Sequence, residues 1–178
     1  MGEVTAHPTT GRGPKFQAPS IITAIHDLSA FDSGKPDLDD WLRRKALKSG
    51  GQTARSYVVC VDGNRVIGYY CLAAGGVQRE VMPNAKFRRN TPIQVPVIIL
   101  GRLAVDKNYQ HQGIGSGLLK DALSRAIQAS QAIGIRAILV HALDEDAVAF
   151  YKQYGFTESP VDHRTLILPI ETAIAALR

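Results

Sequence analysis

The hydrophobic residues of this chain follow two different spacings. Short apolar runs bounded by turn residues predict strands, and apolar residues three or four positions apart predict helices. Segments 54–61 and 66–74 flank Asp62, Gly63 and Asn64, a turn sequence typical of a β-hairpin. Strands that alternate with helices late in the chain indicate an α/β fold with a mixed central sheet flanked by helices. The predicted strands are 19–28, 54–61, 66–74, 95–105, 136–143 and 165–168, and the predicted helices are 36–47, 114–133 and 144–154.

The chain has 178 residues, which suits one domain with a substantial core. Residues 1–18 show no hydrophobic period, so we expect a flexible tail there and a single domain over 19–178. Segment 75–90 is predicted as a loop or a short irregular segment. Because proline cannot donate to a ladder, we expect strand pairing only after Pro96. No apolar run reaches the ~18 residues that a membrane span needs, so no membrane partner is expected.

The apolar segment 95–105 leads through a short polar loop into glycines and then an amphipathic helix. The first backbone N–H groups of a helix have no partner within it, and the helix dipole favours an anion there. Gly113 and Gly115 are expected to need positive φ or a close backbone approach to a ligand. This pattern predicts a pyrophosphate site, although an ordinary strand–turn–helix corner has the same glycines. Neither the Walker sequence nor a good dinucleotide fingerprint is present.

Two ordered motifs give this site a family. The spacing of Gln110, Gly113 and Gly115 after an apolar strand resembles motif A of the GCN5-related N-acetyltransferases, and AVAFYKQYGF (147–156) resembles their later helix-and-strand motif. The resemblance extends from about Pro19 to Leu168 and implies the GNAT fold with acetyl-coenzyme A as the acetyl donor. The residues that it assigns to the donor are Leu103, Ala104, Val105, Gln110, His111, Gln112, Gly113, Ile114, Gly115 and Ser116.

Tyr151 is the candidate general acid. A phenol has an ordinary pKa near 10, so it stays protonated at neutral pH and can donate to a leaving thiolate. The alternative is that Tyr151 only packs beside Phe150, and Tyr154 is expected in the core. His141 and His163 are candidate bases, but the apolar strand around His141 favours a hydrogen-bonded core histidine.

Two departures from the wider family affect the chemistry. Many members carry a glutamate base on the central strand, whereas residues 101–105 here contain no carboxylate. The nucleophile must be neutral, and an α-amino group, with a pKa of about 7.7–8.0, loses its proton far more readily than lysine. We therefore predict an α-amino acceptor. The asparagine common before the last helix is Asp144 here, which puts that capping contact in doubt.

A narrower resemblance, to one group of acetyltransferases, indicates the acetyl acceptor. The runs FDSGKPDLDDWLRRKALK (31–48), FRRN (87–90) and VPVIILGRLAVD (95–106) resemble the toxins of acetyltransferase toxin–antitoxin modules. This implies a cytoplasmic enzyme that acetylates the α-amino group of aminoacyl-tRNA and stops translation, with a ribbon–helix–helix antitoxin as partner. A homodimer, and operator DNA bound through the antitoxin complex, remain open. The alternatives are an acetyltransferase for a small amine or a protein N-terminus, and a non-enzymatic nucleic-acid-binding protein.

The charge distribution points to a polyanionic partner. Residues 41–136 contain 15 of the 21 Lys and Arg residues but 4 of the 16 Asp and Glu residues, a net charge of +11. Part of this charge would serve the phosphates of coenzyme A. Lysines on a solvated flank are the alternative interpretation. The residues predicted to form one basic strip for the tRNA acceptor end are Arg44, Lys45, Lys48, Lys86, Arg88 and Arg89.

The two cysteines suggest no metal site. Cys60 and Cys71 fit no metal-ligand spacing and lie in predicted strands. We therefore expect small buried hydrophobic side chains in a reducing compartment, and no metal.

Overall fold

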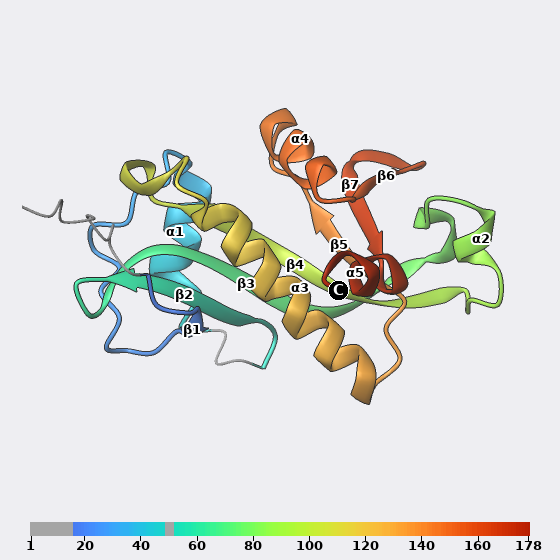
Figure 1. The fold of residues 1–178 in the computed structure, drawn as a ribbon, viewed down its shortest axis with the longest axis horizontal. Coiled ribbons are helices and arrows are strands. Elements are labelled where there is room, and N and C mark those ends of the chain that lie inside the picture. The colour runs from blue at the N-terminus through green and yellow to red at the C-terminus, as the bar shows by residue number, and fades with distance from the viewer. Residues whose placement is uncertain (1–15, 49–51) are drawn as a thin grey trace, which may run out of the picture.

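The computed structural model describes residues 16–48 and 52–178 and shows a seven-stranded sheet with helices on both faces (Figure 1). The strand order is β1-β2-β3-β4-β5-β7-β6, and β4–β5 is the parallel pair among antiparallel neighbours. The strands are β1 (Ser20–Ile21), β2 (Arg55–Val61), β3 (Arg65–Gln78), β4 (Gln94–Val105), β5 (Ala137–His141), β6 (Thr157–Ser159) and β7 (Asp162–Pro169). The helices are α1 (Pro36–Arg44), α2 (Ala85–Arg88), α3 (Ile114–Ala132), α4 (Glu145–Gln153) and α5 (Ile170–Ala176), with 3-10 turns η1 (Arg79–Val81) and η2 (Lys107–Tyr109). This confirms the predicted α/β class and mixed sheet.

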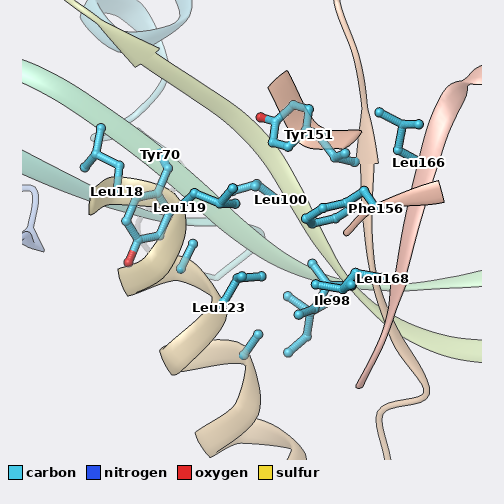
Figure 2. Packing of buried hydrophobic residues seen from close by; sticks show 14 of the residues in the cluster. Tyr70, Ile98, Leu100, Leu118, Leu119, Leu123, Tyr151, Phe156, Leu166 and Leu168 are labelled. Atoms are coloured by element: carbon cyan, nitrogen blue, oxygen red, sulfur yellow. The ribbon is translucent and has the colours of Figure 1, made fainter. Parts of the chain in front are cut away.

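The largest core lies between the sheet and α3. Leu118 and Leu119 of α3 pack with Leu100 of β4, and all three side chains are at most 1% exposed. Tyr151 and Phe156 enter the same core from α4 and the turn after it (Figure 2). The opposite face of the sheet carries two separate clusters, one under α1 and one under η1 and α2.

Strands β4 and β5 separate in the middle of the sheet. Their parallel pairing runs from Val97 opposite Ala137 to Leu100 opposite Val140 and then stops. At the same point Gly101 is an extra residue on β4, because Cys71 pairs with Arg102 and the next residue of β3 pairs with Leu100. This bulge bends the strand. Beyond it, β4 and β5 diverge and leave a gap between them (Figure 1).

Local signals explain how the helices begin. Pro36 occupies the first turn of α1, where its missing N–H costs no hydrogen bond. The α3 helix begins after Gly113, which has a φ of 82°. The side chain of Asp144 caps α4 by accepting a hydrogen bond from the Ala147 amide at 2.9 Å. The capping contact that the sequence left in doubt is therefore present.

Several predicted boundaries were wrong. Segment 19–28 contains only the two residues of β1, because Thr23–His26 forms a turn in which the Thr23 amide donates to His26 Nδ1 at 2.9 Å. Segment 75–90 is not a loop, since β3 continues to Gln78 and η1 and α2 follow. Its pairing with β4 overrides the two glycines that suggested a break.

Pairing also begins before Pro96 rather than after it. The β3–β4 ladder reaches Gln78 opposite Gln94, and Gly76 lies opposite Pro96. The Pro96 carbonyl accepts from the Arg136 amide at 2.9 Å, on the β5 side of the strand. Since the nitrogen and carbonyl of one strand residue point to the same side, the missing proline N–H costs the β3–β4 ladder nothing.

The sequence-based prediction also missed elements near the C-terminal end of the domain. Strand β6 and helix α5 were not predicted, although Ala173 of α5 is fully buried. Most of the expected 1–18 tail lies outside the described residues, but Phe16 packs edge-on against Tyr109 with ring centroids 6.5 Å apart. No helix in residues 16–48 and 52–178 is long and apolar enough to cross a bilayer.

Candidate active site

A cavity of about 440 Å³ lies where the separated end of β4 meets the start of α3 and the side of α4. We call it the donor cavity. Of the ten residues predicted for the donor, eight line it: Leu103, Ala104, Val105, Gln110, His111, Gly113, Gly115 and Ser116. Gln112 and Ile114 do not line it, and Ile114 is buried in the core instead. Sequence reasoning missed the α4 side of this cavity, which Asp146, Ala147, Phe150, Gln153 and Tyr154 form.

The end of β4 offers unpaired backbone amides to this cavity. The Asp106 amide donates to the Ile67 carbonyl of β3 at 2.8 Å. Because backbone groups alternate in direction along a strand, the amides of Leu103 and Val105 point away from β3. Strand β5 no longer pairs with β4 there. These two amides can therefore hold an extended polar chain.

The start of α3 offers a second group of amides. Gly113 precedes the helix in the left-handed region, and the Gly117 amide makes the first helical bond, to the Gly113 carbonyl at 3.0 Å. The amides of Ile114, Gly115 and Ser116 therefore have no helical partner and suit an anion. His111 also has a positive φ, of 62°, which is unusual for a residue with a side chain.

Of the two reasons predicted for a glycine at 115, positive φ does not apply, and a close approach to a ligand stays a prediction. Gly115 does not appear among the glycines with positive φ, and it lies within the helix. A Cβ there would lie 3.8 Å from Val105 and 3.9 Å from Phe150, both of which line the donor cavity. A longer side chain would therefore occupy the cavity itself.

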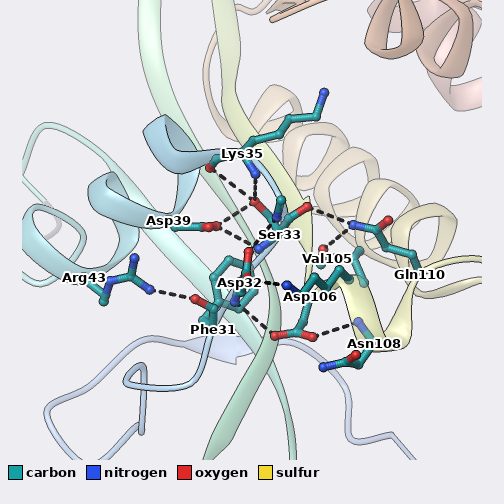
Figure 3. A network of polar contacts seen from close by, with 12 residues as sticks. Phe31, Asp32, Ser33, Lys35, Asp39, Arg43, Val105, Asp106, Asn108 and Gln110 are labelled. Atoms are coloured by element: carbon teal, nitrogen blue, oxygen red, sulfur yellow. Dashed lines mark hydrogen bonds and ion pairs between the residues drawn. The ribbon is translucent and has the colours of Figure 1, made fainter.

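The Gln110 side chain has a structural role. Its Nε2 donates to the Val105 carbonyl at 2.9 Å and to the Ser33 carbonyl at 3.1 Å. Both amide protons are used by the protein. Gln110 therefore joins the segment before α1 to the end of β4 and shapes the donor cavity (Figure 3).

Two buried carboxylates hold the same segment in place. Asp39 Oδ1 accepts from the Ser33 amide at 3.0 Å and from the Ser33 hydroxyl at 2.6 Å. Asp106 accepts from the Asp32 amide at 3.0 Å and from the Asn108 amide at 2.9 Å (Figure 3). Both Asp39 and Asp106 are 5% exposed. Their hydrogen bonds compensate for burial and fix the entry to α1 against η2.

A second cavity, of about 520 Å³, opens in the gap between β4 and β5. We call it the acceptor cavity. The residues that line both cavities are Lys35, Leu38, Leu103, Ala147 and Tyr151. The remaining lining residues of the acceptor cavity are Asp37, Gly101, Arg102, Val140, His141, Ala142 and Leu143. The two cavities therefore meet at Tyr151.

The Tyr151 side chain is held firmly at this junction. It is 5% exposed, and its ring packs against Phe150 and Phe156 with centroids 5.2 and 5.4 Å away. Its hydroxyl points away from Phe156 (Figure 2). Burial raises the pKa of Tyr151 above its ordinary value, because a phenolate would be poorly solvated. Tyr154, predicted in the core, is 38% exposed and lines the donor cavity.

An ion pair joins the two sides of the junction. Lys35 Nζ, in the segment before α1, pairs with the carboxylate of Asp144 at the start of α4. The Lys35 hydrogen bond holds the pKa of Asp144 below its ordinary value. This contact could not be predicted from the sequence, since the two residues are 109 positions apart.

Other side chains give the acceptor cavity its chemistry. The Arg102 guanidinium stacks on Trp41 with 4.4 Å between its carbon and the ring centroid. His141, predicted as a core histidine, is exposed and lines the cavity, so that prediction was wrong. His163 lies outside both cavities and pairs with Glu145 and Glu158. Cys60 and Cys71 are free and buried, as predicted.

The six predicted tRNA-binding residues do not form one strip. Arg44, Lys45 and Lys48 lie at the end of α1, whereas Lys86, Arg88 and Arg89 lie on and after α2 at the opposite end of the molecule (Figure 1). The sequence could not show that the long β3–β4 hairpin separates them. Arg88 is also committed to the protein, because its guanidinium donates to the Met82 carbonyl at 3.0 and 3.2 Å. The other five side chains are exposed.

Comparison with known proteins agrees with this geometry. The family model of the acetyltransferase (GNAT) domain matches residues 53–158. A tRNA-acetylating toxin of Mycobacterium tuberculosis is 47% identical over 163 residues, which cover 91% of this chain and 97% of the toxin.

Three solved structures superpose over most of the chain. AtaT complexed with acetyl-methionyl-tRNAfMet has a TM-score of 0.85 at 29% identity, over 92% of this chain and 100% of that one. An AtaT mutant bound to the C-terminus of the antitoxin AtaR and acetyl-CoA has a TM-score of 0.77 at 29% identity, with coverages of 90% and 96%. The AtaT–AtaR complex bound to DNA has a TM-score of 0.73 at 30% identity, with coverages of 91% and 100%. The chain belongs to the GNAT family of acetyltransferases and has the fold of its tRNA-acetylating toxins.

Proposed function

We propose that this protein is a toxin that transfers the acetyl group of acetyl-coenzyme A to the α-amino group of aminoacyl-tRNA and thereby blocks translation. The observation that carries the proposal is the meeting of the donor and acceptor cavities at Tyr151. The acceptor cavity contains Lys35 and Arg102 but only one carboxylate, Asp37. This charge balance suits a substrate attached to a polyanion better than a cationic small amine.

The donor cavity fits acetyl-coenzyme A by its backbone chemistry. The amides of Ile114, Gly115 and Ser116 would hold the pyrophosphate, and the amides of Leu103 and Val105 would hold the pantetheine arm and the acyl group. Gln112 lines neither cavity, so we assign it no contact with the pyrophosphate or the pantetheine arm. Gln110 acts indirectly, since its amide fixes the cavity wall.

Tyr151 is the general acid of the proposed reaction. Burial keeps its hydroxyl protonated at neutral pH, at the junction where the thioester sulfur and the amine must meet. The phenol donates its proton to the departing thiolate as the new C–N bond replaces the C–S bond.

The partners follow from the relatives. A ribbon–helix–helix antitoxin would neutralise the toxin, and the toxin–antitoxin complex would bind operator DNA. The relatives that support this are AtaT bound to the C-terminus of the antitoxin AtaR and the AtaT–AtaR complex bound to DNA. A homodimer stays a prediction. We place the protein in the cytoplasm, where charged tRNA is found.

Charged tRNA is expected to outcompete other amines. At pH 7 and saturating labelled acetyl-coenzyme A, aminoacyl-tRNA should be acetylated faster than a lysine peptide or a polyamine, because its α-amino group is far more often neutral. The measurement is the label recovered on each acceptor. Faster labelling of the peptide or polyamine would replace the tRNA assignment with a small-amine or protein acetyltransferase.

Gly115→Asp is expected to abolish donor binding. The new carboxylate would point into the donor cavity beside the diphosphate site, and such like-charge contacts cost several kcal/mol, equivalent to ~10²-fold or more in Kd. Calorimetry with acetyl-coenzyme A measures it. The matched control is Gly117→Asp, with the same charge in the same turn but no atom within 4 Å of its Cβ. Equal losses in both variants would contradict the cavity assignment.

Tyr151→Phe is expected to lower kcat by about 10² to 10⁴, the usual contribution of a general acid, with little change in donor affinity. The ring and its packing persist in the variant. Single-turnover acetylation measures the chemical step. Tyr57→Phe, which also removes one phenol hydroxyl but lies outside both cavities, serves as the control and should stay close to wild type. A Tyr151→Phe enzyme of normal rate would assign the proton to water.

The two basic clusters are expected to contribute separately to tRNA binding. Each phosphate contact adds about −0.7 to −0.9 to the slope of log affinity against log salt. Removing Lys86 with Arg89 should flatten the slope by about 1.4 to 1.8 units, and removing Arg44 with Lys45 and Lys48 should flatten it by about two to three units. Lys152→Ala is the control, because that ammonium is paired with Glu158. An unchanged slope would identify a cluster as ordinary solvated surface.

A further inference from the structure

His141 is a histidine at the edge of the acceptor cavity that the reaction described so far does not use. It is the last residue of β5, just beyond the point where β4 and β5 stop pairing. Its side chain is exposed and lines the acceptor cavity together with Tyr151. The chemistry of this position therefore depends on which imidazole nitrogen carries the proton.

The neighbouring hydrogen bonds determine that tautomer. The Thr165 hydroxyl donates to Asp162 Oδ2 at 2.7 Å, and His141 Nδ1 lies 3.0 Å from the same hydroxyl oxygen. A hydroxyl has one proton, and here Asp162 takes it. The Thr165 oxygen can therefore only accept from His141, so Nδ1 carries the proton. The Thr165 hydrogen bond also holds the pKa of Asp162 below its ordinary value, which keeps that carboxylate anionic.

The second imidazole nitrogen of His141, Nε2, can accept a proton. With Nδ1 protonated, Nε2 of the neutral imidazole has a lone pair. Across residues 16–48 and 52–178, Nε2 makes no hydrogen bond, and the ring borders the acceptor cavity. The charged or titratable groups around this cavity are Lys35 and Asp37 from the segment at α1, Arg102 from β4 and Tyr151 from α4, with Asp162 of β7 behind Thr165.

We propose that His141 is the general base of the reaction, with Thr165 and Asp162 as positioning residues that fix its tautomer and ring. The proposal rests on the acetyl transfer described above. The amine nitrogen forms a bond to the acetyl carbon, the C–S bond breaks, and Nε2 takes one proton from the nitrogen, directly or through one water. Tyr151 gives one proton to the sulfur. Protons and electrons therefore balance without a further reactant.

The first test replaces the base while keeping its hydrogen bond. In His141→Asn the side-chain amide can still donate to Thr165, but no basic nitrogen remains. We expect kcat at pH 7 to fall by about 10² to 10⁴ with unchanged calorimetric affinity for acetyl-coenzyme A. The control is His163→Ala, which removes an exposed histidine outside both cavities. A His141→Asn rate near that of the control would overturn the proposal.

The pH dependence separates a base from a structural residue. The deficit of His141→Asn should shrink from pH 6 to pH 9, because a neutral amine and hydroxide replace the missing base as the pH rises. Added imidazole should partly restore His141→Ala for the same reason. A deficit that is constant with pH and insensitive to imidazole would assign His141 a structural role.

The positioning residues are tested through the hydroxyl. Thr165→Val keeps the shape and removes the hydroxyl, so kcat should fall about tenfold, the equivalent of one hydrogen bond. Thr165→Ser restores the hydroxyl and should recover most of the rate. If both variants have the same rate, the Thr165 hydroxyl has no part in the reaction, and the positioning role of Thr165 and Asp162 is wrong.

The two proposals fail in different ways. If the wild-type protein acetylates a peptide α-amine or a polyamine but no charged tRNA, the substrate assignment fails, and the His141 variants are assayed on that amine. If charged tRNA is acetylated equally by wild type and His141→Asn, the substrate stands and the base is elsewhere.

Discussion

The whole site depends on the loss of pairing between β4 and β5 beyond Leu100 and Val140. Unpaired backbone groups in a protein interior are costly, so the sheet leaves this edge open only where a substrate can supply hydrogen bonds. Gly101 makes the opening possible. A Cβ at this bulge would lie 2.9 Å from the Cys71 sulfur, closer than real contacts allow. The buried thiol therefore has a packing role beneath the bulge.

The walls of the gap are held by polar contacts rather than by more apolar packing. Asp39, Asp106 and Gln110 bond the backbone of the segment before α1, which places Lys35 and Leu38 over both cavities. Removing one partner of such a network leaves a buried polar group unpaired, which costs more than the bond itself contributes. This arrangement holds α1 in the position where it forms one side of both cavities.

The sequence predicted what local rules determine. Hydrophobic spacing located the hairpin, the central strand, α3 and α4, and the glycine at 113 located the left-handed turn before α3. The sequence-based prediction failed where contacts between distant segments determine the local structure. Strand β3 continues through Gly75 and Gly76 because β4 pairs with it there. The basic residues of α1 and α2 were grouped by composition, and only the fold shows that they lie at opposite ends.

His141 shows why the side of a strand matters as much as its composition. An apolar run surrounds it in sequence, yet alternate residues of a strand face opposite sides of the sheet. Ile138 and Val140 enter the α3 core, whereas Leu139 and His141 face the other side, and His141 lines the acceptor cavity. Residues 101–105 therefore need no carboxylate, because the neighbouring strand presents an imidazole to the same gap.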